Sequence, residues 1–152
     1  MRILIRTIVM MAVASAMFAV AQTHGASEAE LKLLESVNNA RKAQGLPGLR
    51  WSNELAAAAR KHAEAMAQHG SAEHGFAGEP SLATRVTQAG AHFVWLAENV
   101  CQGARVEAIE TEFLSSPKHR ANILDSDMDS IGVGVVERGG QLFAVEDFSK
   151  AK

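Results

Sequence analysis

The sequence predicts an α+β fold in which helices cover an antiparallel sheet. Near the C-terminus, two apolar stretches (131–136 and 142–145) flank Gly139-Gly140, a glycine pair typical of a tight hairpin turn. Upstream, three stretches repeat their apolar residues at helical spacing. Helices that precede and interrupt the strands favour α+β over a βαβ arrangement.

Residues 1–21 have the features of a secretory signal peptide. Arg2 and Arg6 form a basic start, residues 8–20 are almost wholly apolar, and Ala19-Val20-Ala21 offers small residues for cleavage. An uncleaved anchor is the alternative, but the apolar run is short for a bilayer span. We therefore expect one exported domain over residues 22–152, periplasmic or extracellular, with no transmembrane segment after signal removal.

Composition indicates which binding partners and which cross-links to expect. Without its basic leader the chain is acidic, aromatic residues make up 5%, and no basic patch stands out, so nucleic acid is not an expected partner. Cys101 is the single cysteine, which excludes an intramolecular disulfide. Its apolar, strand-like surroundings predict a buried, unreactive thiol.

Two helices are predicted in the first half of the chain. Ser27 and Glu30 form a capping box, and the apolar repeat that follows stops near Gly45. Ser52 opens a second helix that ends at Gly70. The alanines at 56–59 give this second helix a face suited to close packing.

The second half alternates loops, short helices and strands. Residues 71–79 read as a loop, 80–88 as a short helix and 93–100 as a strand. A third helical stripe spans 106–113 and stops before Pro117. In the hairpin, valines alternate with glycines over 132–135, so one face can pack while the other permits close backbone approach.

The segment 115–124 holds the most informative histidine. Ser116 followed by Pro117 predicts a helix start, with the serine as the cap. His119 then lies in the first turn, where the helix dipole disfavours imidazolium. A neutral imidazole can bind a metal or accept a proton.

Three residues are candidates for a functional site: His74 in a glycine-flanked loop, Glu98 in a strand, and His119. Two histidines and a carboxylate suffice for a metal site with open positions, and they also make an acid–base pair. Their large separations leave open the alternative that the three are unrelated.

The remaining motifs point to no other chemistry. His62 and His69 share a helix face without the glutamate of a His-Glu-x-x-His motif, which predicts solvated or packing histidines. Arg85 and Arg120 could clamp an anion, although structural salt bridges are the alternative. The chain has no Gly-x-Ser-x-Gly elbow, Walker loop or dinucleotide fingerprint.

Taken together, these segments resemble the CAP superfamily (SCP domain) in its short bacterial form. The resemblance runs from about Leu31 to Phe148 in family order. It rests on Asn38 with Arg41, Leu49-Arg50-Trp51, the alanine-rich helix 55–66, Glu73-His74-Gly75, Arg85, Ala89-Gly90, Glu98-Asn99-Val100, the block 116–124, and the closing segments 131–134 and 145–148.

The resemblance implies a three-layer α-β-α sandwich with a central antiparallel sheet. It also implies a cleft lined by two histidines and acidic residues, which in some members holds a divalent cation such as zinc. Carried over by position, the cleft residues are His74, Glu98 and His119, and the two histidines are the implied metal ligands.

Two departures from the family pattern weaken the implied metal site. The fuller members carry a second glutamate three residues after a tryptophan, but here Phe113 and Ser116 occupy those positions. Glu112 is one residue out of phase with the missing acid. Lys118 stands where a glycine is usual and adds a positive charge beside His119.

The function predicted on this basis is a ligand-binding module for a lipid or another small ligand, with a cleft able to hold a divalent metal. The alternative is a hydrolase in which His119 or Glu98 activates a water, with or without a metal. A third interpretation gives the polar cluster a purely structural role. Family membership alone does not decide among them.

Overall fold

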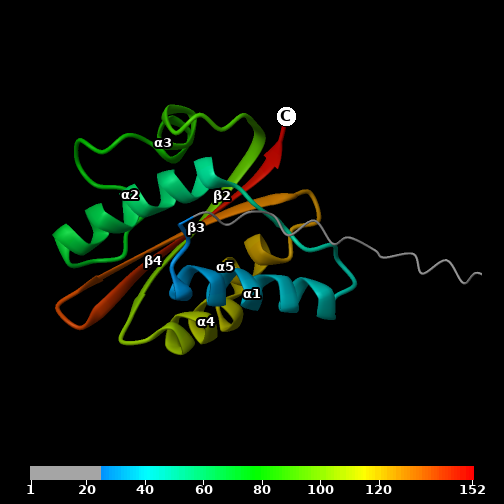
Figure 1. Ribbon diagram of the computed structural model, residues 1–152, viewed down its shortest axis with the longest axis horizontal. Coiled ribbons are helices and arrows are strands. Elements are labelled where there is room, and N and C mark those ends of the chain that lie inside the picture. Colours follow the sequence, from blue (N-terminus) through cyan, green and yellow to red (C-terminus); the bar gives the residue numbers. More distant parts are fainter. Residues whose placement is uncertain (1–24) are drawn as a thin grey trace, which may run out of the picture.

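A four-stranded sheet lies between two layers of helices (Figure 1). The computed structural model describes residues 25–152, so the expected signal peptide, residues 1–21, lies outside the described residues. The helices are α1 (Glu28–Ala43), α2 (Asn53–His69), α3 (Leu82–Gln88), α4 (Val106–Ser115) and α5 (Pro117–Ile123), and the strands are β1 (Arg50–Trp51), β2 (Phe93–Gly103), β3 (Ser130–Arg138) and β4 (Gln141–Ala151). The three-layer α-β-α sandwich is confirmed.

The sheet has the order β1-β3-β4-β2. The pairs β3–β4 and β4–β2 are antiparallel as predicted, and Gly139 and Gly140 both adopt positive φ in the hairpin turn. The two-residue strand β1 was not predicted, and it pairs in parallel with β3. Two residues carry no alternation from which a strand could be inferred. β2 forms the opposite edge of the sheet from β1.

The two long helices α1 and α2 begin at the predicted capping residues. Ser27 and Glu30 form the capping box of α1. Ser52 caps α2, which ends at Gly70 in the left-handed conformation. Ser81 caps α3, so this helix begins two residues after Pro80, where its start was expected.

Helix α2 and the sheet approach each other very closely. A Cβ added to Gly132 would lie 2.0 Å from the Ala56 nitrogen, and one added to Gly134 would lie 2.3 Å from the Arg60 nitrogen. The predicted glycine face of β3 therefore meets the predicted alanine face of α2. Figure 1 shows α2 and α3 on this side of the sheet and α1, α4 and α5 on the other.

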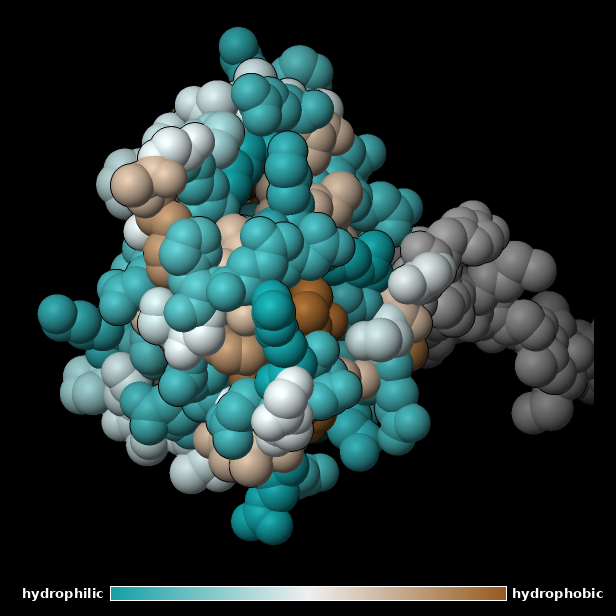
Figure 2. All heavy atoms as spheres, turned by 90° about the vertical axis from the view of Figure 1, so that its left-hand side faces the viewer, coloured by the Kyte–Doolittle hydropathy of each residue, from teal (hydrophilic) through white to brown (hydrophobic). Residues whose placement is uncertain are grey.

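Apolar side chains fill both interfaces between sheet and helices. On the α1, α4 and α5 side the core includes Leu33, Ile109, Phe113 and Phe148, and on the α2 side it includes Met66. The face shown in Figure 2 is mostly hydrophilic, with small separate apolar areas. Among residues 25–152, no helix combines the length and the apolar composition that crossing a bilayer requires.

Candidate functional site

The three candidate residues lie at the β2 edge of the sheet. Glu98 and Asn99 are neighbours on β2, so their side chains point to opposite faces. Glu98 faces α2 and α3, while Asn99 faces α5. His74 comes from the loop between α2 and α3, and His119 from α5. The edge strand is thus approached by one histidine from each helical layer.

His74 and Glu98 form a direct hydrogen bond, 2.9 Å from Nδ1 to Oε1. The second oxygen of Glu98 binds the buried guanidinium of Arg85, which favours an ionised carboxylate that only accepts. His74 therefore donates through Nδ1, and in the neutral ring Nε2 is left as a free acceptor. Because the His74 side chain is 64% exposed, this nitrogen is open to a ligand.

His119 is held differently, through its backbone and its ring face. The Asn99 side chain donates to the His119 carbonyl at 3.2 Å, and Asn122 donates to Asn99 Oδ1 at 2.9 Å. The imidazole meets the Phe113 ring edge to face, with centroids 5.2 Å apart. Its Nδ1 is buried and has no hydrogen-bond partner among the described residues.

The pKa of His119 is lowered, mainly by burial. The nearby imidazole of His74 lowers it further, whereas the carboxylate of Glu112 acts in the opposite direction. The direction agrees with the prediction, but burial is the larger cause and not the helix dipole. The out-of-phase Glu112 therefore still acts electrostatically on His119.

The predicted cap of α5 is half correct. Ser116 occupies the N-cap position and Pro117 the first turn, yet the Ser116 side chain makes no capping hydrogen bond. The Ser116 carbonyl still accepts from the Arg120 nitrogen at 2.9 Å. The helix start is therefore specified by the proline and the backbone.

The structure joins His74 to Glu98 and brings His119 within electrostatic reach of His74. Three open cavities lie elsewhere, and none of the three is lined by His74, Glu98 or His119. One of about 380 Å³ is lined by Ser115, Pro117, Arg120, Ala121 and Leu124. Helical spacing places Pro117, Arg120 and Ala121 on the face of α5 opposite His119.

Comparison with known proteins identifies the family of this chain. Residues 34–148 match the CAP family, described as the cysteine-rich secretory protein family. The chain belongs to the CAP family. The domain is 30% identical over 111 residues, 72% of this chain and 43% of the relative, to the uncharacterised protein YkwD of Bacillus subtilis.

Two solved structures share the fold of this CAP domain. An extracellular protein of Bacillus anthracis containing an SCP domain has a TM-score of 0.74 at 24% identity, over 80% of this chain and 40% of the other. An outer surface protein of Borrelia burgdorferi has a TM-score of 0.76 at 21% identity, over 83% of this chain and 95% of the other. The CAP domain thus spans less than half the length of either Bacillus relative.

The residues of this CAP domain do not fit a closed zinc site. Within residues 25–152, no three or more His, Cys, Asp or Glu side chains are grouped so that they could hold a metal ion. Glu98 is already engaged by Arg85 and His74, and Ser116 supplies no carboxylate. A zinc ion with three protein ligands would need a further donor.

Sequence reasoning missed the role of His62, and it did not single out Glu79 or Asp147. His62 is fully buried, with Nδ1 2.6 Å from Glu79 Oε1 and Nε2 2.8 Å from the Glu73 carbonyl. Asp147 pairs with Glu98 across β4 and β2. The acidic pair Glu146-Asp147 between apolar residues was a usable signal for Asp147, but no spacing rule indicates His62.

Asp147 and Arg85 complete the buried polar cluster. Burial raises the pKa of Asp147 well above its usual range, and the charge of Glu98 adds to this effect, whereas the charge of Arg85 opposes it. Arg85 takes the structural salt-bridging role, on Glu98 and, at 3.8 Å, on Glu79. Arg120 forms no ion pair within residues 25–152.

Cys101 is buried, as predicted. Burial raises its pKa to about 11, which keeps the thiol protonated at neutral pH. A nucleophilic cysteine is therefore not part of the site.

Proposed function

We propose that this CAP domain is exported, to the periplasm or outside the cell, and binds a small molecule or lipid at His74, Glu98 and His119. The observation that carries the proposal is the bond between exposed His74 and buried Glu98. It orients an imidazole with Nε2 facing outward. Such a nitrogen can accept a hydrogen bond from a hydroxyl or amide of a ligand.

Export is supported by the basic and apolar pattern of residues 1–21. It is also supported by the descriptions of the Bacillus anthracis and Borrelia proteins as extracellular and outer-surface proteins. These descriptions apply to those proteins, and for this chain they are the grounds of a proposal.

The charge arrangement favours binding over hydrolysis. A general base needs a carboxylate or imidazole within reach of the attacking water. Glu98 is buried, and both of its oxygens are engaged by His74 and Arg85. The carboxylate thus serves to orient His74, and it is not free to activate a water.

The cavity beside α4 and α5 is suited to an apolar ligand, which would be a second ligand of the domain. Pro117, Ala121 and Leu124 give it apolar walls, and Arg120 places a cation at its edge. A lipid with an anionic head group matches this combination.

Native mass spectrometry of the purified protein tests the binding function. We expect a co-purified small molecule or lipid on the wild type and its loss in the His74→Ala, His119→Ala double variant. His92→Ala is the matched control, because His92 lies outside the site. Equal occupancy of wild type and double variant would exclude the proposed site, and a ligand lost on Arg120→Ala alone would assign binding to the α4–α5 cavity.

Zinc chloride titration tests the metal separately. With two imidazoles and no free carboxylate, we expect zinc to bind weakly, and the double variant to abolish that binding. Tight, stoichiometric zinc on the wild type, confirmed by elemental analysis, would show that a further donor completes the site. Histidine-dependent turnover of peptide, ester or cell-wall substrates would instead establish the hydrolase alternative.

A further inference from the structure

His62 lies in the middle of α2 with no exposed surface, yet both of its ring nitrogens have polar partners. Nδ1 lies 2.6 Å from Glu79 Oε1, and Nε2 lies 2.8 Å from the Glu73 carbonyl. Both partners belong to the loop that joins α2 to α3 and that carries His74. Figure 1 shows this loop on the α2 side of the sheet.

The two partners of His62 are both acceptors. A carbonyl oxygen can only accept, and the surroundings of Glu79 favour a carboxylate, since Oε2 accepts from the Phe76 nitrogen at 3.2 Å and the Arg85 cation lies 3.8 Å from Oε1. Both ring nitrogens of His62 must then donate, which makes the ring a buried imidazolium.

The charges around this imidazolium balance. His62 and Arg85 are the cations, and Glu79 and Glu98 are the anions, with Glu98 Oε2 3.9 Å from His62 Nε2. Asp147 would be a fifth charge, but it is buried and no described group donates to either of its oxygens, so it is neutral. The cluster therefore holds two positive and two negative charges.

The loop needs such a clamp because it has little structure of its own. Within residues 71–80 the only backbone hydrogen bonds described are from Ser71 to Met66 and from Glu79 to Phe76. The bonds from His62 reach both ends of the segment 73–79. Glu73 is the residue next to His74, so the bond to its carbonyl fixes the backbone from which the His74 side chain extends.

We propose that His62 is a positioning residue: its imidazolium clamps the loop at Glu73 and Glu79, and so holds His74 in place on Glu98. The inference deepens the binding site of the proposed function. Its test uses no ligand, so it can succeed or fail independently of the ligand-binding proposal.

The first test is nuclear magnetic resonance of the protein labelled with ¹⁵N-histidine, which distinguishes protonated from bare ring nitrogens. In the wild type at pH 7 we expect both nitrogens of His62 to carry hydrogen, and hydrogen on Nδ1 of His74. A bare nitrogen on His62 would overturn the proposal.

The second test removes the clamp. In His62→Leu, we expect His74 to lose its preference for hydrogen on Nδ1, and the Phe76 amide to exchange with solvent at least tenfold faster. His62→Gln retains a donor for one acceptor and should give an intermediate effect. His92→Gln, at a histidine outside the clamp, is the control and should change neither signal.

A folded His62→Leu protein with wild-type His74 signals and Phe76 exchange would overturn the proposal. If His62→Leu does not fold, Glu79→Ala tests the same clamp from the loop side, where the side chain is partly exposed. In Glu79→Ala the readout is the His74 tautomer, because the Phe76 amide loses its own acceptor in this variant. We expect a mixed His74 tautomer, and a wild-type His74 signal would equally overturn the proposal.

Discussion

Glu146 is a buried acid that makes the stability of the domain depend on pH. It is fully buried on β4, and its Oε2 accepts a hydrogen bond from Asn99 at 3.0 Å. Burial raises its pKa to about 8, although the bond from Asn99 acts in the opposite direction. The side chain is therefore mainly protonated at pH 7 in the folded protein.

The raised pKa of Glu146 predicts that the stability of the domain falls as the pH rises. In the unfolded chain the carboxyl returns to a pKa near 4.5, so its stabilising contribution is complete below pH 4.5 and is lost as the pH rises through about 8. A shift of this size corresponds to a loss of a few kcal/mol. In Glu146→Gln the amide still accepts from Asn99 and does not titrate, so the curve should be flatter by that amount.

Urea denaturation from pH 4 to pH 9 measures this difference between wild type and variant. Glu64→Gln, at an exposed position on α2, is the matched control and should follow the wild type. Parallel curves for wild type and Glu146→Gln would show that Glu146 is ionised in the folded protein.

At the scale of single residues, the sequence predicts some members of the polar cluster and misses others. His74, Glu98 and His119 were selected because their local motifs stand out. His62 and Asp147 act through partners 17 and 49 positions away, Glu79 and Glu98. Such pairings arise when the chain folds, and no local pattern records them.

At the scale of elements, long segments with capping residues were predicted best. The starts of α1 and α2 follow from Ser27 and Ser52, and the hairpin follows from Gly139-Gly140. β1 was missed because two residues have no periodicity, and it exists through its pairing with β3. Local signals thus predict elements that are stabilised locally, and they miss those that depend on a distant partner.

The contact between α2 and β3 gives the second prediction. In Gly134→Ala the new Cβ would lie 2.3 Å from the Arg60 nitrogen and 2.4 Å from the Ala59 carbonyl carbon. Both are backbone atoms of α2, so no side-chain rotation relieves the clash and the helix must move off the sheet. We expect a loss of about 3 kcal/mol or more in unfolding free energy.

Thermal and urea denaturation measure this loss. Gly75→Ala is the control, because a Cβ there meets no atom within 4 Å and the φ of Gly75 is not positive. A Gly134→Ala protein as stable as the wild type would show that α2 can shift without cost.

At the scale of the whole molecule, Arg41 links regions that are far apart in the sequence. From α1 it donates to the carbonyls of Pro47 at 2.9 Å, Ile123 at 2.9 Å, Asp125 at 2.7 Å and Met128 at 3.3 Å. These carbonyls lie in the turn before β1, at the end of α5 and in the segment that leads into β3. One fully buried side chain thus links α1 to the turn before β1, to the end of α5 and to the segment before β3.

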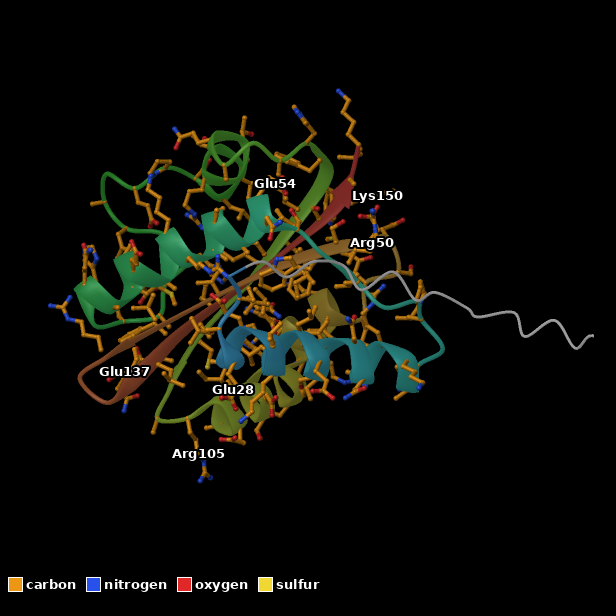
Figure 3. All side chains as sticks on the ribbon, in the orientation of Figure 1. Glu28, Arg50, Glu54, Arg105, Glu137 and Lys150 are labelled. Carbon is orange, nitrogen blue, oxygen red and sulfur yellow. The ribbon has the colours of Figure 1, made fainter. Side chains whose placement is uncertain are left out.

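Charge at the surface contributes much less to this organisation. Figure 3 shows Arg50 and Lys150 near one end of the sheet, and Arg105 and Glu137 toward the other. Arg50 pairs with Asp129 at 3.4 Å and Lys150 with Asp127 at 3.1 Å, in both cases between exposed side chains. Such pairs contribute about 1 kcal/mol or less.

The difference between buried and exposed arginines is the third prediction. Arg41→Met leaves four carbonyls without their donor, and we expect a loss of about 3–5 kcal/mol in unfolding free energy. Arg105→Met removes the same charge from an exposed residue and should change stability by less than about 0.5 kcal/mol. Urea denaturation of both variants measures the contrast.

Amide exchange extends this prediction to the site. Because Arg41 binds the carbonyl at the end of α5, its loss should speed exchange throughout α5, the helix that carries His119. Exchange in α2, on the other side of the sheet, should rise only as far as global stability falls. Equal acceleration in α2 and α5 would mean that Arg41 stabilises the fold as a whole and has no separate influence on the position of His119.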